Sequence, residues 1–108
     1  VHQGVSAELI AARYGLSRGA MDAFAVRSHL LAARAEDDGR WHGTVLPVGG
    51  VAGDEGVRRD TSAEALAALK PAFFSAETAA RFPEIGWGVT AGNSSQVSDG
   101  ASALLLME

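Results

Sequence analysis

The sequence contains no cysteine among its 108 residues. This absence excludes disulfides, thiolate metal ligands and a cysteine nucleophile within the chain itself. Aromatic residues make up only 6% of the chain. No apolar run approaches the roughly 20 residues of a membrane-spanning helix, and no positively charged start is followed by the apolar run of a signal peptide. We therefore expect a cytoplasmic chain without a membrane partner.

Basic residues are outnumbered, with nine Lys and Arg against thirteen Asp and Glu and a net charge of −4. Because a phosphate backbone needs a basic face, we expect no nucleic-acid partner. The length suits one small domain, and 47% hydrophobic residues are ordinary for a soluble globular protein. Since the sequence starts at Val1 and not at Met, we expect a processed or cut chain.

Caps and apolar spacing predict two helices in the first third of the chain. Ser6 is expected to cap a helix that Gly15 ends, and Ser17 to cap a longer helix to about Asp37. Apolar and small residues recur along the second helix at three- and four-residue spacing, which predicts one buried face. The members of this face are Met21, Phe24, Ala25, Ser28, Leu31, Ala32 and Ala35.

Two shorter helices and an edge strand are expected further on. Residues 44–46 read as a short extended segment, and the proline that follows makes it an edge. Thr61 and Glu64 have the spacing of a capping box for a third helix. Ser75 is expected to cap a fourth helix that ends before Pro83.

The last segment has the pattern of a buried strand. The unbroken apolar run from Ala103 to Met107 is typical of a strand covered on both faces, as in a parallel sheet. No other segment offers a comparable neighbour for a strand over 101–107. The pattern therefore favours an α/β fold class, with a helical excursion before one strand whose sheet lies outside the chain.

The sequence offers no self-contained catalytic or metal-binding set. His2, His29 and His42 lack partners at metal-ligand spacing, and no carboxylates have a zinc or calcium pattern. There is no P-loop, G-x-G-x-x-G motif or G-x-S-x-G elbow. We therefore assign neither a metal nor a catalytic residue to this chain.

Two polar segments are better suited to binding. In residues 91–95 a glycine allows close approach of a ligand, and the hydroxyls and amides that follow are expected at the start of a helical turn. Arg58 and Arg59 end a glycine-rich loop and could meet phosphate. It is equally open at this point that Asn93 and Ser94 merely cap a turn and that the arginines are solvated.

These segments resemble a thiolase, an acyl-CoA acetyltransferase, over nearly the whole chain. The most specific match is TAGNSSQVSDGASALLLM at 90–107. The segments HQGVSAE at 2–8, DAFAVRSH at 22–29 and LKPAF at 69–73 follow in the order of the family. A resemblance of this extent implies the thiolase fold.

Thiolases have two similar α/β halves, each a mixed sheet between helices, and a largely helical loop domain that covers CoA. By this resemblance, residues 1–88 would be the helical CoA-covering loop domain. Residues 89–108 would be the last helical turn and strand of the N-terminal half. The chain would thus be a mostly helical fragment followed by one buried strand of a mixed sheet.

The resemblance implies reversible acyl transfer between acyl-CoA and acetyl-CoA, as in 3-ketoacyl-CoA thiolysis or acetoacetyl-CoA formation, in fatty acid metabolism such as beta-oxidation. CoA would be a co-substrate, with no covalently bound cofactor, and the full-length enzyme would be a homodimer or homotetramer. The nucleophilic cysteine would precede this chain, and the catalytic histidine and second cysteine would follow it, so the isolated chain would be inert. One alternative is a non-catalytic thiolase-like protein that binds or transfers CoA or lipid. A second alternative is a small helical interaction module.

Residue by residue, the resemblance assigns the chain to substrate and CoA binding. His2 matches a position at the acyl and pantetheine pocket, and Gln3 stands where many members have Met, which changes the shape of that pocket. Arg58 matches an arginine that lies against the CoA adenine and ribose phosphate. Arg59 and Asp60 belong to the same segment.

The remaining matches concern the pantetheine arm. Phe73 matches an aromatic residue that flanks it, and Ala91 and Ser95 match contacts to its amides, while Asn93 holds the turn. This sequence departs from the family between these positions. Residues 74–88 add an insert of about one helix near the expected CoA mouth.

Overall fold

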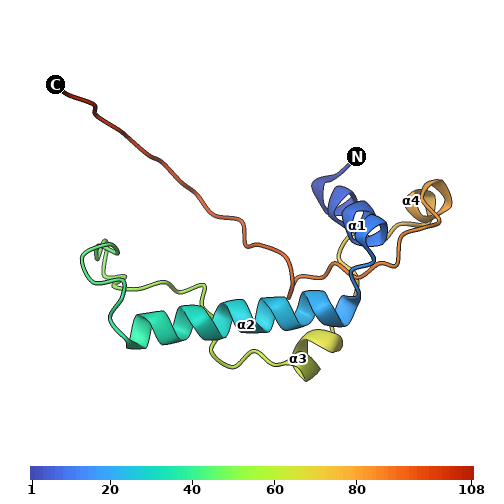
Figure 1. Cartoon of the computed structure of the whole chain (residues 1–108), viewed down its shortest axis with the longest axis horizontal. Helices are drawn as coiled ribbons and strands as arrows, with labels where there is room; N and C mark the ends of the chain where they lie inside the picture. The colour runs from blue at the N-terminus through green and yellow to red at the C-terminus, as the bar shows by residue number, and fades with distance from the viewer.

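The computed structural model describes residues 1–108 and contains four helices joined by turns and extended segments. They are α1 (Gln3–Tyr14), α2 (Arg18–Asp37), α3 (Ala63–Ala67) and α4 (Ala76–Arg81). Figure 1 shows α2 as the long axis of the helical part, with α3 below it and with α1 and α4 near its N-terminal end. None of these helices is both long enough and apolar enough to cross a bilayer.

Helix α1 begins earlier than the sequence predicted. Its cap is His2, whose Nδ1 accepts a hydrogen bond from the N–H of Gly4 at 3.1 Å. The prediction of Ser6 as the cap was wrong. Histidine is not a preferred capping residue, but here its ring nitrogen accepts the hydrogen bond that a serine hydroxyl usually accepts. The predicted end is confirmed, since Gly15 has φ +64° in the left-handed conformation that ends a helix.

Helix α2 begins where expected, but its predicted buried face was wrong. Ser17 caps the helix, since its hydroxyl accepts a backbone N–H of the first turn at 3.2 Å. The buried residues of α2 are Asp22 and Ala33, whereas Phe24 is 71% exposed and Leu31 is 50% exposed. The apolar face stays open because α3, only five residues long, is the one helix that packs against α2.

The two short helices both form, each with a serine cap. Ser62 caps α3, so the prediction of Thr61 was wrong by one residue. Either hydroxyl suits a cap, and the extended backbone of Ser62 decides between them. A hydrogen bond with its own backbone N–H and one with Ser62 lower the pKa of Glu64. Ser75 caps α4, which ends before Pro83 as predicted.

The most completely buried stretch of chain is residues 88–90, which lie against α1. Both carboxylate oxygens of Glu8 accept backbone N–H groups there, from Gly88 at 2.9 Å and from Val89 at 2.7 Å. On the other side, the N–H of Ala72 donates to the carbonyl of Val89 at 2.9 Å. Helix α1, the segment after α3 and residues 88–90 thus form one packed unit.

Residues 39–60 form a long loop beyond the C-terminal end of α2, visible in green in Figure 1. The edge strand expected at 44–46 does not form. Instead, Val48 and Val51 pair across the tight turn of Gly49 and Gly50, which have φ +61° and +89°. A strand needs a partner for its N–H and C=O groups, and this loop pairs only with itself.

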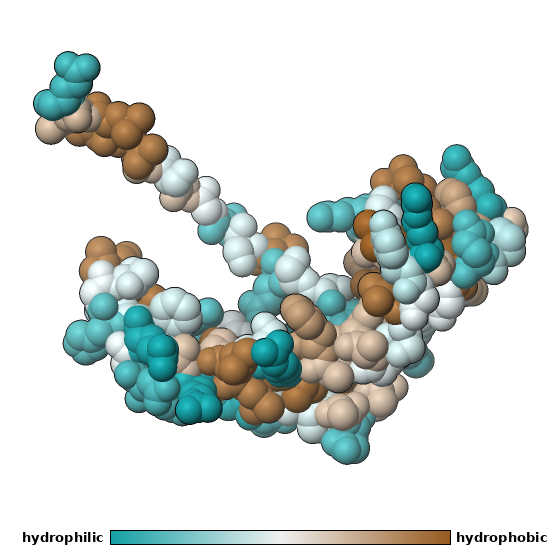
Figure 2. All heavy atoms as spheres, viewed as in Figure 1, coloured by the Kyte–Doolittle hydropathy of each residue, from teal (hydrophilic) through white to brown (hydrophobic).

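Residues 97–108 project away from the helices as an extended tail (Figure 1). The strand expected over 101–107 was therefore not found, and Leu104, Leu105 and Leu106 are 86%, 80% and 86% exposed. Figure 2 shows this apolar end standing clear of the rest of the molecule. No other segment of the chain offers the tail a neighbouring strand, so the mixed sheet expected of an α/β fold is absent from these residues.

Candidate functional site

A groove of about 600 Å³ lies beside the N-terminal half of α2. Helix α3 and the turn at residues 91–96 form its other sides. Its apolar wall consists of Met21, Phe24, Ala25, Leu66 and Leu69. The groove therefore offers a ligand an apolar surface between two helices, with polar groups along the opposite rim.

Five of the predicted site residues line this groove, namely Arg58, Asp60, Ala91, Asn93 and Ser95. They come from two segments that α3 and α4 separate along the chain. The fold thus brings Arg58, Asp60 and the polar turn at residues 91–95 to one apolar wall. A few convergent polar groups on an apolar surface are typical of small-molecule sites.

Two hydrogen bonds hold the segment of Arg58 at the groove. The Nδ1 atom of His29, on α2, accepts the backbone N–H of Arg58 at 3.1 Å. The Nε2 atom of Gln96 donates to the carbonyl of Gly56 at 2.9 Å, which joins the turn to the loop. The guanidinium of Arg58 is exposed and makes no ion pair within residues 1–108. Its backbone is fixed while its charge stays accessible.

Arg59 does not line the groove. Its guanidinium contacts the carboxylates of Glu36 at 2.6 Å and Asp37 at 2.9 Å, at the C-terminal end of α2. The hydrogen bond from Arg59 lowers the pKa of Asp37, and the contacts with both carboxylates raise the pKa of Arg59. The adjacent arginines therefore have different surroundings, and only Arg58 lines the groove.

The turn of residues 90–95 is held by its own side chains. The Oδ1 atom of Asn93 accepts the N–H of Thr90 at 2.8 Å, and the hydroxyl of Ser94 donates to the carbonyl of Thr90 at 2.6 Å. The role of Asn93 in holding the turn is thus seen directly. No helix begins here, so the expectation of free N–H groups at a helix start was wrong.

Gly92 has a role that the sequence did not reveal. A Cβ atom on this residue would lie 2.6 Å from Leu69 Cδ1 and 2.9 Å from Leu66 Cγ. The missing side chain therefore lets the turn pack against α3. Gly92 also lines the groove, so the expectation that a ligand can approach its backbone stays a prediction.

Three predicted residues lie outside the groove, at the start of α1. The rings of His2 and Phe73 are 5.0 Å apart between centroids and tilted by 32°. Phe73 also lies against Gly4, while Gln3 is exposed as the first residue of the helix. The structure thus joins His2 to Phe73 but does not bring these residues to Arg58.

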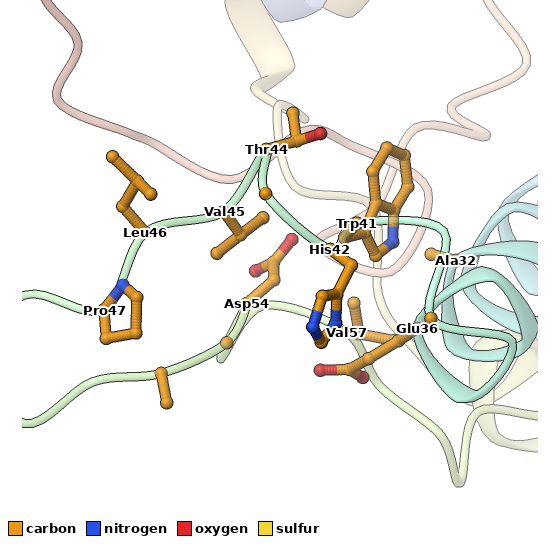
Figure 3. Close-up of a pocket in the computed structure, with 14 residues that line it drawn as sticks. Ala32, Glu36, Trp41, His42, Thr44, Val45, Leu46, Pro47, Asp54 and Val57 are labelled. Carbon is orange, nitrogen blue, oxygen red and sulfur yellow. The ribbon is translucent and has the colours of Figure 1, made fainter.

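A second hollow, of about 640 Å³, lies between the C-terminal half of α2 and residues 39–57 (Figure 3). Trp41, Val45 and Leu46 contribute apolar surface, and Glu36 and Asp54 contribute carboxylates. None of the predicted site residues lines it. No group of three or more potential metal ligands occurs anywhere in residues 1–108.

The sequence did not single out three polar residues that line the groove or hold the segment from Gly88 to Asn93. His29 has no metal-ligand partner in the sequence, yet it lines the groove and its Nδ1 atom accepts the backbone N–H of Arg58. Glu8 and Asp22 are charged residue types that the sequence did not assign to the core, yet both are buried. Two signals were available: Glu8 is spaced between Val5 and Ala11 as a buried helix position, and Asp22 follows Arg18 by four residues.

Comparison with known proteins identifies the family of the chain. The whole chain, residues 1–108, matches the family described as "Thiolase, N-terminal domain". It is 41% identical to the mouse protein named "3-ketoacyl-CoA thiolase B, peroxisomal", over 98% of this chain and 26% of that protein.

Bacterial relatives give similar values. The chain is 40% identical to the "3-ketoacyl-CoA thiolase" of Bacillus subtilis strain 168, over 97% of this chain and 29% of that protein. It is 39% identical to the "Probable acetyl-CoA acyltransferase" of Staphylococcus aureus strain COL, over 98% of this chain and 27% of that protein. The chain spans about a quarter of the length of these relatives. It belongs to the thiolase family.

Proposed function

We propose that this chain is the CoA-binding portion of a thiolase, which transfers acyl groups reversibly between acyl-CoA and acetyl-CoA. Residues 1–88 would cover the CoA, and residues 89–108 would join the N-terminal half of the enzyme, where the apolar tail would gain its sheet. The observation that carries the proposal is the groove, in which Arg58 and the turn at 91–95 meet on one apolar wall.

Two parts of CoA, its phosphates and its pantetheine arm, have chemistry that suits the groove. Its phosphates are anionic and favour an arginine that has no carboxylate partner, as is the case for Arg58. Its pantetheine arm carries two amides on an otherwise apolar chain, which the hydroxyl of Ser95 and the backbone of the turn can partner. The second hollow is less suitable, because no Lys or Arg lines it to balance the carboxylates of Glu36 and Asp54, whereas Arg58 lines the groove beside Asp60.

The reaction itself would need groups that this chain does not supply. Thiolase chemistry uses a cysteine thiolate to accept the acyl group and a histidine with a second cysteine to move the proton. The 108 residues contain no cysteine. We therefore propose that residues 1–108 bind and orient CoA, that the reacting thiols lie elsewhere in the full-length protein, and that the isolated chain is inert.

The proposal extends to the whole protein. It would be a cytoplasmic homodimer or homotetramer that acts on 3-ketoacyl-CoA, either in fatty acid beta-oxidation or in acetoacetyl-CoA formation. The names of the mouse and Bacillus relatives support the substrate class.

The substitution Arg58→Ala in the full-length protein tests the CoA-binding role. A charge-assisted hydrogen bond contributes about 1.5–3 kcal/mol, so KM for CoA substrates should rise about tenfold to a hundredfold, with a much smaller change in kcat. The matched control is Arg27→Ala, which removes the same charge from an exposed site on α2 outside the groove. Steady-state thiolysis of acetoacetyl-CoA measures both constants.

Three results would contradict the proposal in different ways. An unchanged KM in Arg58→Ala would remove this arginine from the CoA site. Turnover by residues 1–108 alone would show that the reacting groups lie within them. CoA binding without any turnover by the full-length protein would favour the non-catalytic alternative, a protein that binds or transfers CoA or lipid.

A further inference from the structure

A continuous chain of polar contacts runs beneath the groove and connects α1, α2 and α3 to the turn at 91–96. It starts at Glu8 on α1, passes through residues 88–93 and reaches Asp22 and Arg18 on α2. Every buried side-chain nitrogen or oxygen in the chain has a hydrogen-bond partner. This network is therefore complete without any ligand.

Glu8 is the most unusual member, because it is a carboxylate that is only 1% exposed and has no cationic partner. Both of its oxygens accept backbone N–H groups, from Gly88 and Val89. A buried carboxylate without these bonds would be strongly unfavourable. The position of Glu8 thus determines where residues 88 and 89 can lie.

The backbone next to these two bonds adopts a conformation that needs such support. Trp87 has φ +52°, in the left-handed region that residues other than glycine rarely adopt. Strained residues persist where the surrounding structure holds them in place, and they concentrate at functional sites. The chain enters the groove turn directly after this residue, so Glu8 fixes the point from which the turn departs.

The second anchor acts on the turn itself. The Nδ2 atom of Asn93 donates to Asp22 Oδ1 at 2.9 Å and to the carbonyl of Gly88 at 2.9 Å. Asp22 is only 4% exposed, and its other oxygen accepts from Arg18 Nε at 2.7 Å. The two carboxylates therefore hold the two ends of the segment from Gly88 to Asn93.

We infer that Glu8 and Asp22 are positioning residues for CoA: they do not touch the ligand but hold the turn at 91–95 in its binding conformation before CoA arrives. This inference rests on the proposed function of the groove. A pre-formed turn binds more tightly than a mobile one, because less conformational entropy is lost on binding. Substitution of either carboxylate should therefore weaken CoA binding without changing the rate of the chemical step.

The test is Glu8→Gln in the full-length protein. The amide has the shape of the carboxylate but replaces one acceptor with a donor, which then faces a backbone N–H. We expect the Kd for CoA, measured by calorimetry, and the KM in thiolysis to rise about tenfold, as for the loss of one hydrogen bond of this kind. The value of kcat at saturating substrate should stay within about twofold of the parent value, since the turn can still form when CoA occupies it.

The matched control is Glu84→Gln, the same chemical change at an exposed position outside the groove. It should leave both constants unchanged. If Glu8→Gln does not fold, Asp22→Asn decides in the same assays, because it keeps the shape of Asp22 while removing its charge from Arg18. The expected result for that variant is again a raised Kd with an unchanged kcat.

The outcomes separate the inference from the proposed function. Unchanged CoA affinity in a folded Glu8→Gln protein overturns the inference alone. A loss of kcat at unchanged KM also overturns it, because it would assign the carboxylate to the chemical step. If the parent protein itself does not bind CoA, both the proposed function and the inference fall.

Discussion

Gly4 and Phe73 pack so closely that a single methyl group tests their contact. A Cβ atom on Gly4 would lie 2.3 to 2.4 Å from three ring carbons of Phe73. Carbon atoms in favourable contact are about 3.5–4.0 Å apart, so the ring must move by on the order of an ångström in the Gly4→Ala protein. The same ring lies 5.0 Å from that of His2, the cap of α1, so its movement also disturbs the start of the helix.

Two opposing contributions decide the size of the effect. Gly4 is the second residue of α1, so alanine there stabilises the protein by at most about 0.5–1 kcal/mol, its advantage over glycine in a helix interior. Overpacking costs about 1–3 kcal/mol. Gly4→Ala should therefore destabilise the protein by roughly 1 kcal/mol, the difference of the two. In a Phe73→Ala background the clash is absent, and the same substitution should stabilise the protein by at most about 0.5–1 kcal/mol.

The expected reversal of sign is measured in a double-mutant cycle. Urea unfolding of the full-length protein, followed by far-ultraviolet circular dichroism, gives the free energy of unfolding for the parent, both single variants and the double variant. The coupling energy should be about 1–3 kcal/mol, the cost of the clash. The reasoning is refuted if Gly4→Ala has the same effect with and without the phenylalanine ring.

Three further predictions concern the loop of residues 39–60 and the helix ends. Arg59→Ala should lower stability at neutral pH. Because the pKa of Asp37 is lowered in the folded protein, the contribution of this ion pair is present above the ordinary aspartate pKa of about 3.9. The difference in unfolding free energy between Arg59→Ala and the parent should therefore narrow as the pH falls through the lowered pKa of Asp37. A difference that stays constant with pH would show that the ion pair is not its cause. Gly15→Ala should lower the free energy of unfolding by about 1–2 kcal/mol, because the residue has φ +64°. Gly19→Ala should raise it by about 0.5–1 kcal/mol, because this helical glycine has open space around it. If Gly15→Ala and Gly19→Ala shift the urea midpoint in the same direction, the backbone conformation does not explain their effects on stability.

The sequence predicted all four helices because their end signals are local. Ser17 and Ser75 cap as expected, and Gly15 ends the first helix. The errors occur where the choice depends on backbone geometry or on an uncommon cap, as at His2 and Ser62. A pattern of residue types does not show which of two adjacent hydroxyl residues caps a helix. It also does not show whether a histidine or a serine four residues later is the cap.

Burial was predicted less well, because it depends on what covers each face. The apolar face of α2 was expected to be buried, yet Phe24 and Leu31 stay open because no second helix layer reaches them. Conversely, Glu8 and Asp22 are charged residue types at buried positions, which residue type alone does not indicate. Their partners are backbone groups and Asn93, far away in the sequence, and periodicity contains no information about such distant polar contacts.

The candidate site was predicted through resemblance more than through chemistry. The residue types alone left it open whether Arg58 and Arg59 are solvated, and the structure places only Arg58 at the groove. The groove could not be foreseen from spacing, since α3 and α4 separate its two polar segments. The strand over 101–107 could not be verified from the chain alone, because strand pairing is a property of neighbours and not of one segment.

Helix α3 is only five residues long, well below the length at which an isolated helix is stable in water. The guanidinium of Arg18 donates to the carbonyl of Leu66 within α3 and, at 3.1 Å, to that of Leu69 just beyond the helix. Unfolding of α3 is therefore coupled to that of α2. The packing of Gly92 against Leu66 and Leu69 would be lost in the same cooperative event. Occupancy of the groove and the lifetime of this short helix are consequently linked, so a bound ligand slows hydrogen exchange at amides it never touches.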